Sequence, residues 1–170
     1  RMRTVLSRLT AASVLAAAVA GLSACAGYAP PSDLSGLSRD EIVARMGPPE
    51  TQRQVAGGSR LEFPRGPFGV HTWFVYLDPN GRATRSEQVL TEANFLRINP
   101  GMSQEEVLLV LGRPGEVSGL ARARGSVWSY RYDNNRCLWF QIEMTPENAV
   151  RSAGYGEPPE CALRGDASHP

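Results

Sequence analysis

The sequence predicts an α+β protein of two tandem modules, each with short helices packed on a three- to four-stranded antiparallel sheet. Three observations predict it. A helix signal with the same start and stop residues occurs twice, and matching strand patterns follow both copies. The composition, with 42% hydrophobic and 21% charged residues, is close to that of folded globular proteins. A chain of 170 residues can hold one domain or two small repeats.

The first 24 residues have the order of charge and apolarity that is typical of a secretory signal. Three arginines precede an uncharged stretch rich in Ala, Val and Leu. This stretch is too short and too rich in alanine for a membrane-spanning helix, which needs about 20 strongly apolar residues. We therefore expect residues 1–24 to be a signal peptide, and residues 25–33 to be a tether.

The signal ends in Leu22-Ser23-Ala24-Cys25, which resembles the lipobox of bacterial lipoproteins, where a small residue precedes a lipidated cysteine. This resemblance implies that Cys25 becomes the acylated, palmitate-bearing N-terminus. It also implies that Ala26, in place of Asp, directs the chain to the periplasmic face of the outer membrane. Two or more acyl chains give stable anchoring without a transmembrane helix. The alternative is an ordinary signal peptide with a chance cysteine near its cleavage site.

Each module is expected to open with a short helix, because the segment Gly36–Pro49 aligns without gaps on Gly101–Pro114. Both copies have the S-x-x-E spacing of a capping box, then an apolar pair four residues apart, and then a glycine and a proline that end the helix. These residues are Ser38, Glu41, Ile42, Met46 and Gly47 in the first copy, and Ser103, Glu106, Val107, Leu111 and Gly112 in the second.

Strand patterns follow each helix, shifted by two further residues in the second copy. Apolar side chains at every second position predict strands with one buried face, which the short helix would cover. The matching positions are Gly58–Phe63 with Gly125–Tyr130, then Trp73, Val75 and Leu77 with Phe140, Ile142 and Met144, then Ala83 with Val150.

These repeats place the first module at residues 34–90 and the second at residues 91–155. In the second module, Phe95 and Ile98 predict a short additional helix that packs with it. Residues 156–170 are rich in Gly, Pro, Ala and Ser, so we expect them to form a tail.

Cys161 is expected to clamp that tail through a disulfide with Cys137. The two cysteines are an even pair in a chain with a secretory signal, and an oxidising compartment favours their pairing. Closing a loop of roughly 25 residues would stabilise the fold by about 3 kcal/mol. The alternative is two unpaired, buried thiols.

The second copy carries the motif Gly101-Met102-Ser103-x-x-x-Val107-x-x-x-Leu111-Gly112-x-Pro114, which resembles the signature of the BamE family, or SmpA/OmlA domain. The first copy has Leu37, Ile42 and Met46 in place of Met, Val and Leu. The segment Pro67-Phe68-Gly69-x-x-Thr72-Trp73-Phe74 is also similar to an aromatic strand of that family.

The resemblance implies a two-layer fold of short helices on an antiparallel sheet. It also implies a lipoprotein of the outer-membrane β-barrel assembly machinery. Family members typically carry one module, and the two modules of this chain resemble the architecture of the secreted β-lactamase inhibitor proteins.

Residues suited to catalysis are few. His71 and His169 are the only histidines, which is too few for a His-based metal cluster or a nucleophile–His–acid set. No glycine-rich phosphate motif is present. We therefore expect no enzymatic activity, no cofactor or metal, and no small-molecule substrate.

Nucleic-acid binding is not expected either. All 18 basic residues are arginine, and three of them lie in residues 1–24. Without those three, 15 basic residues stand against 17 acidic ones, a net charge of −2. Nucleic-acid binding normally requires a basic patch.

A binding role remains, for which we consider two classes. The first is a non-enzymatic scaffold or adaptor lipoprotein, with outer-membrane assembly proteins as partners, acting in barrel assembly or in envelope integrity. The alternative is a periplasmic enzyme inhibitor whose concave tandem sheet plugs an active site. Lipidation favours the first, since an anchored inhibitor reaches only enzymes near the membrane.

The candidate contact surface is the loop Pro64–His71, where the two copies differ in chemistry at equal length. It is rich in Gly and Pro and presents Arg65 and Phe68. Interfaces favour aromatic and arginine anchors. By the family resemblance, Trp73 and Phe74 extend the patch, with one of them facing outward by strand alternation. The alternative is that Phe68 caps the core of the first module.

Overall fold

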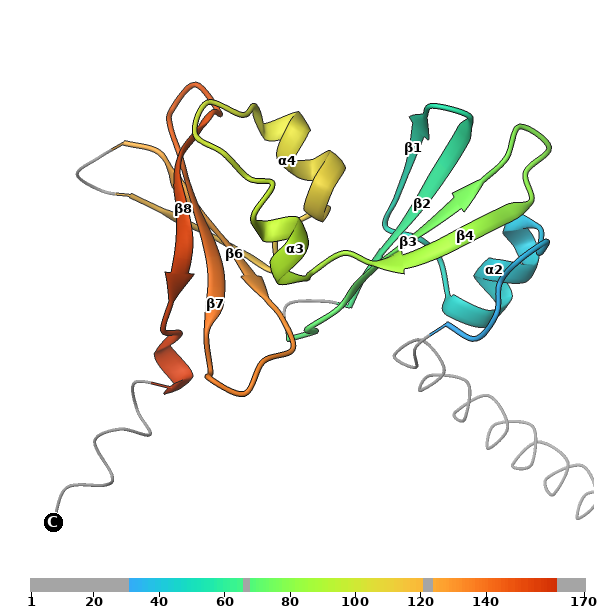
Figure 1. Ribbon diagram of the computed structural model, residues 1–170, viewed down its shortest axis with the longest axis horizontal. Helices are drawn as coiled ribbons and strands as arrows, with labels where there is room; N and C mark the ends of the chain where they lie inside the picture. Colours follow the sequence, from blue (N-terminus) through green and yellow to red (C-terminus); the bar gives the residue numbers. More distant parts are fainter. Residues whose placement is uncertain (1–30, 66–67, 121–123, 162–170) are drawn as a thin grey trace, which may run out of the picture.

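The structure is a computed structural model that describes residues 31–65, 68–120 and 124–161. The expected signal peptide and Cys25, and the end of the chain from residue 162, lie outside the described residues. The described part contains two four-stranded antiparallel sheets and short helices (Figure 1). The predicted α+β fold of two modules is therefore confirmed. None of the helices in this part is long and apolar enough to cross a membrane.

The first module begins with helix α2 (Arg39–Met46). A four-stranded sheet follows, in which each strand pairs with the next: β1 (Thr51–Val55), β2 (Gly58–Pro64), β3 (Thr72–Leu77) and β4 (Ala83–Gln88). Ile42 and Met46 of α2 pack on one face of this sheet, against a cluster that includes Leu61 and Val75.

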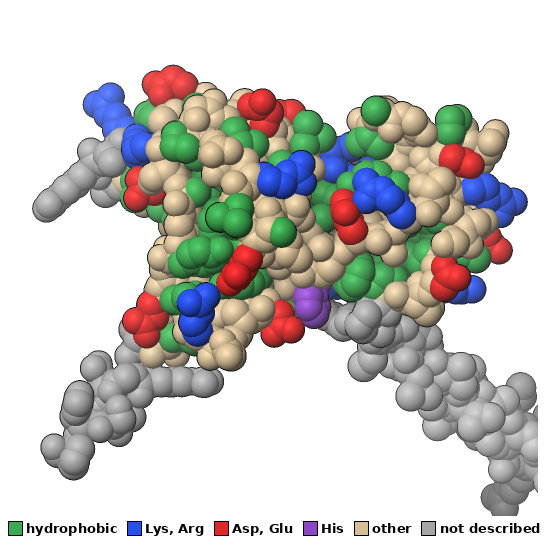
Figure 2. Space-filling view, in the orientation of Figure 1, with side chains coloured by type: hydrophobic (Ala, Val, Ile, Leu, Met, Phe, Trp, Pro, Cys, Tyr) green, Lys and Arg blue, Asp and Glu red, His purple; other side chains and the backbone are tan. Residues whose placement is uncertain are grey.

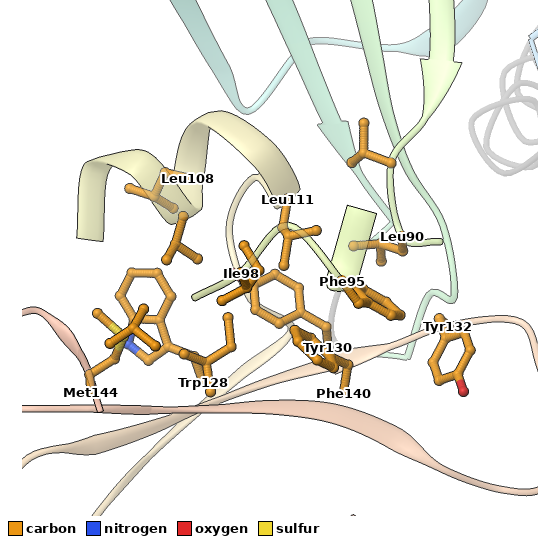
Figure 3. Close-up of a cluster of buried hydrophobic side chains, with 14 of the residues drawn as sticks. Leu90, Phe95, Ile98, Leu108, Leu111, Trp128, Tyr130, Tyr132, Phe140 and Met144 are labelled. Carbon is orange, nitrogen blue, oxygen red and sulfur yellow. The ribbon is translucent and has the colours of Figure 1, made fainter. Parts of the chain in front are cut away.

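The second module repeats this order after one additional short helix. Its elements are α3 (Glu92–Phe95), α4 (Gln104–Leu111), β5 (Glu116–Gly119), β6 (Ser126–Arg131), β7 (Trp139–Met144) and β8 (Val150–Gly156). Side chains of α3 and α4, among them Phe95 and Leu111, point onto Trp128, Tyr130 and Phe140 of the sheet (Figure 3). The Phe95 and Phe140 rings stack with their centres 4.2 Å apart.

Both predicted capping boxes are present. The Glu41 carboxylate accepts the backbone N–H of Ser38 at 2.7 Å, and the Glu106 carboxylate accepts that of Ser103 at the same distance. These backbone hydrogen bonds, followed by those from the serine hydroxyls, lower the pKa of both glutamates. Each helix therefore starts at the serine that the sequence indicates.

The residues before each capping box attach the helix to the last strand of its own sheet. The backbone of Gly36 donates to Ala83 at 2.8 Å, and Ala83 donates back to Leu37 at 2.9 Å. In the second module Gly101 donates to Val150 at 2.8 Å, and Val150 donates to Met102 at 2.7 Å. The repeated motif thus closes each module by joining its first helix to its fourth strand.

The shift of two residues between the copies lies in one hairpin. The pair Gln54↔Ser59 joins β1 to β2, and the corresponding pair Gly119↔Ser126 joins β5 to β6. Four residues, 55–58, separate the members of the first pair along the chain, and six residues, 120–125, separate the members of the second. The insertion leaves the rest of each sheet in the same register.

Helix α4 also covers the second face of the first sheet. Arg60 of β2 donates to the carbonyl of Leu109 at 2.8 Å and to that of Leu108 at 3.3 Å. The Phe74 ring of β3 belongs to the same buried cluster as Leu108 and Leu111. The layers therefore run α2, first sheet, α4, second sheet (Figure 1).

This layering corrects two expectations. The first sheet is covered on both faces rather than one, because the helix of the second module packs against it. The two sheets also do not form the concave tandem surface that the inhibitor alternative requires, since α4 lies between them (Figure 1).

Candidate partner-binding site

A pocket of about 250 Å³ lies where the two modules meet. Its walls come from the segment after α2, the loop between β2 and β3, the linker between the modules, the segment after α4, and the end of β6. Its lining includes Glu50, Arg65, His71, Leu90, Arg113 and Arg131. The pocket therefore requires both modules in contact.

Ion pairs surround this pocket. Arg113 of the second module pairs with Glu50 of the first. Arg131 pairs with Glu160, which lies next to a smaller pocket on the other side of Arg131. The Arg113–Glu50 pair joins the two modules and helps to fix how they sit against each other, although an exposed pair contributes only up to about 1 kcal/mol.

Phe68 lies at the edge of this region and is 80% exposed. Its ring centre is 5.3 Å from the guanidinium carbon of Arg131, which also lies 4.2 Å from the ring centre of Trp139. Because Phe68 is exposed and belongs to neither buried cluster, the alternative that it caps the core of the first module is wrong.

Arg65 is placed differently from Phe68. Its side chain is half-buried, donates to the backbone carbonyl of Met46 at 3.4 Å, and lies 5.9 Å from the ring centre of Phe63. Arg65 therefore packs against the end of α2 while also lining the pocket, rather than extending from the loop beside Phe68.

Trp73 and Phe74 point to opposite faces of the sheet, as strand alternation predicts. Trp73 is half-buried and packs against the apolar cluster that contains Ile42 and Met46 of α2. Its ring centre lies 6.4 Å from that of His71. Phe74 is only 1% exposed, and the Arg60 guanidinium carbon lies 3.7 Å from its ring centre. The expectation that Phe74 contacts a partner is wrong, because α4 covers the face on which it lies.

Cys137 and Cys161 are bonded in the structure, with Cα atoms 6.3 Å apart. This separation lies in the range that disulfides require. The bond holds the last described turn beside the loop between β6 and β7, next to Trp139 and Glu160. Cys25, the expected lipidation site, lies outside the described residues.

Glu50, Arg113 and Arg131 line the pocket but were not predicted from the sequence as site residues. A signal for two of them was present in the repeat. Arg113 stands where the first copy has Pro48, and Arg131 stands where it has Pro64. Positions at which two copies of a module differ in charge are candidates for contacts that only one copy makes.

The described residues contain no group of three or more His, Cys, Asp or Glu side chains placed to hold a metal ion. His71 lines the pocket between the modules. The chemistry available there is charge pairing and hydrogen bonding from arginine.

Comparison with known proteins identifies no family for this chain. No family model matches the chain, and no curated protein matches it. Among solved structures, one similar chain is an extracellular protein containing a SCP domain from Bacillus anthracis, with 12% identity and a TM-score of 0.30. The match covers 80% of this chain and 50% of that one.

Another similar structure is a DUF4309 family protein, YjgB, from Bacillus subtilis, with 13% identity and a TM-score of 0.28. That match covers 78% of this chain and 88% of the other.

Proposed function

We propose that the protein is a non-enzymatic scaffold or adaptor lipoprotein of the outer membrane, and that partners contact it at the junction of the two modules. One observation carries the choice of surface. Phe68 is 80% exposed and lies over Arg131, where the loop of the first module reaches the second. Aromatic and arginine side chains are the commonest energetic anchors of protein interfaces.

The anchor in this proposal is the acyl group on Cys25. The tether of residues 25–33 would place the first module close to the membrane surface, and the second module would then lie farther along the chain. Acidic and basic side chains are interspersed over the face seen in Figure 2, which suits a partner that presents both kinds of charge.

The process in this proposal is outer-membrane barrel assembly or envelope integrity. The support is the resemblance of the segment Gly101–Pro114 to the BamE signature, together with the lipobox. The inhibitor alternative loses its main support, since the two sheets do not share one concave surface.

The first experiment examines the anchor. Mass spectrometry of the protein extracted from membranes should find an acylated peptide that begins at Cys25. A Cys25→Ala variant should leave the membrane fraction. A mature protein that begins at another residue, or a Cys25→Ala variant that stays fully membrane-bound, would contradict the proposal.

The second experiment examines the partner. The lipidated full chain is crosslinked in intact cells, purified from membranes, and its partners are identified by mass spectrometry. The adaptor proposal expects subunits of the barrel-assembly machinery. Recovery of a single soluble periplasmic enzyme would favour the inhibitor alternative instead.

A further inference from the structure

Strand β8 forms one edge of the second sheet, on the side away from the first module (Figure 1). Four consecutive residues of this strand, Ser152–Tyr155, are exposed. At its start, the backbone of Val150 bonds to Gly101 and Met102. Within residues 31–65, 68–120 and 124–161, the loop bonds that cover this edge end there. An uncovered edge presents N–H and C=O groups that another strand can bind.

The corresponding edge of the first module is protected by charge. Its edge strand β4 carries Arg85 and Glu87. The repeat places Ser152 and Gly154 of β8 at these two positions. Charged side chains on an edge strand hinder its pairing with another chain. β8 therefore lacks the protection that β4 has.

The backbone of β8 points away from the sheet at Ala153 and Tyr155. Ser129 of β6 accepts a backbone N–H from the residue before β5, so its backbone points away from Gln141, which lies opposite it in β7. Because alternate residues of an antiparallel strand bond to opposite neighbours, Gln141 bonds to Gly154 of β8. The residues on either side of Gly154 then offer their N–H and C=O groups at the free edge.

An antiparallel pair of β8 strands from two copies of the chain suits this edge. With a two-fold axis at Gly154, Ala153 of one copy lies opposite Tyr155 of the other, and their outward N–H and C=O groups meet. The small alanine leaves room for the tyrosine ring, which is 45% exposed. On the axis itself, glycine faces glycine. The strand is thus complementary in shape to its own copy.

Charge also favours a second copy as the occupant. A two-fold contact brings residues near the axis close to their own counterparts, so a charged residue there would repel itself. The span Ser152–Gly156 contains no charged residue. The same register places Glu157 opposite Arg151 of the other copy. Arg151 already pairs with Glu143 of its own chain at 3.9 Å, and the new contact adds to that one.

We propose that β8 pairs with β8 of a second copy of this chain, so that the two second modules form one continuous antiparallel sheet across a two-fold axis at Gly154. This self-association goes beyond the proposed adaptor function and does not depend on it, because the contact uses residues of the second module alone.

The first test is disulfide crosslinking of the full chain purified in detergent. A Cβ added at Gly154 meets no atom within 4 Å, so Gly154→Cys should fold. On the axis, the two Cα atoms would be about 4.5 Å apart, a separation that a disulfide can span. With diamide as the oxidant, Gly154→Cys should give at least about tenfold more linked dimer than Ser86→Cys. Ser86 is the matched control, since it is exposed on the edge strand of the first module.

The second test uses charge instead of a bond. Gly154→Glu places two carboxylates opposite each other on the axis, and Gly154→Lys places two ammonium groups there. Each variant should raise the dissociation constant of the dimer at least about tenfold in analytical ultracentrifugation. An equimolar mixture of the two variants should restore the dimer, because a carboxylate then faces an ammonium group.

Equal crosslinking of Gly154→Cys and Ser86→Cys would overturn the proposal, as would a wild-type chain that sediments as a monomer at every concentration. If both charged variants fold, judged by circular dichroism, and their mixture does not pair, the proposal is also overturned, in favour of a strand of another protein as the occupant. If a charged variant fails to fold, the crosslinking of Gly154→Cys decides the question.

Discussion

The guanidinium of Arg60, in the first module, donates to the backbone carbonyl of Leu109 in helix α4 of the second module at 2.8 Å. Arg60 is only 3% exposed and pairs at 2.6 Å with Glu62, which is 2% exposed. The last turn of α4 contains no basic residue. The negative end of the helix dipole instead faces the buried Arg60 guanidinium of the other module. This contact makes the two modules one layered body.

Loss of this cation should be costly. Arg60→Ala removes the guanidinium donor from the Leu109 carbonyl and one of the two donors to the Leu108 carbonyl, which also accepts the Gly112 backbone N–H. It also removes one partner of the buried Glu62 carboxylate. We expect urea denaturation to show a loss of about 3 kcal/mol in the free energy of unfolding. Arg97→Ala, an exposed control, should change it by less than about 1 kcal/mol. Equal effects of the two variants would contradict the claim that Arg60 stabilises the contact between the modules.

The glycines that begin β2 and β6 should not tolerate a side chain. A Cβ on Gly58 would lie 2.0 Å from the carbonyl oxygen of Leu77, and one on Gly125 would lie 2.1 Å from that of Met144. Both residues also have positive φ, at 149° and 137°. Gly58→Ala and Gly125→Ala should each lower the free energy of unfolding by at least about 2 kcal/mol.

The matched control for these glycines is Gly154, where an added Cβ meets no atom within 4 Å. Gly154→Ala should change the stability by no more than about 0.5 kcal/mol in the same denaturation experiment. If all three variants were equally stable, close backbone approach would not explain the repeated glycine.

The two capping boxes predict a loss of stability in acid. The pKa values of Glu41 and Glu106 are lowered in the folded protein, so their contribution is full above the ordinary value of 4.5 and is lost as the pH falls through the folded value. A Glu41→Gln, Glu106→Gln double variant keeps an acceptor at each position but has no charge to lose.

Denaturation at several pH values measures this effect. The double variant should be less stable than wild type near pH 7, and the difference should shrink from about pH 5 to about pH 3. A difference that stays constant over this range would show that the two carboxylates do not carry the acid sensitivity.

The bond between Cys137 and Cys161 should stabilise the fold, because it closes a loop with a sequence separation of 24. Replacing both residues by serine should lower the free energy of unfolding by about 3 kcal/mol. Periplasmic material should show no free thiol from either cysteine when labelled under denaturing conditions. Two labelled thiols per chain would refute the disulfide.

The repeat made most of the fold predictable. The serine, glutamate and glycine of each helix segment are local signals, so Ser38 and Ser103 mark helix starts wherever the chain lies in space. The period of two in Trp73, Val75 and Leu77 likewise indicates a strand. These features depend on neighbours along the chain, which the sequence displays directly.

The contacts between modules were not predictable in the same way. The burial of Phe74 depends on α4, which begins thirty positions later in the chain. An alternating strand shows that Phe74 faces away from Trp73 but does not show what covers that face. In the sequence alone, Arg60 and Arg113 cannot be told from ordinary surface charges, because the sequence does not show how the second module packs against the first.

The central claim is that partners contact the junction of the modules at Phe68. The most direct measurement is the amount of crosslinked partner that co-purifies from membranes with Phe68→Ala, compared with Leu96→Ala. Both side chains are 80% exposed, so the two variants remove equally accessible apolar surface. We expect Phe68→Ala to reduce capture at least about tenfold at unchanged thermal stability, and Leu96→Ala to leave it at the wild-type level. Capture that is unchanged in Phe68→Ala would contradict the claim.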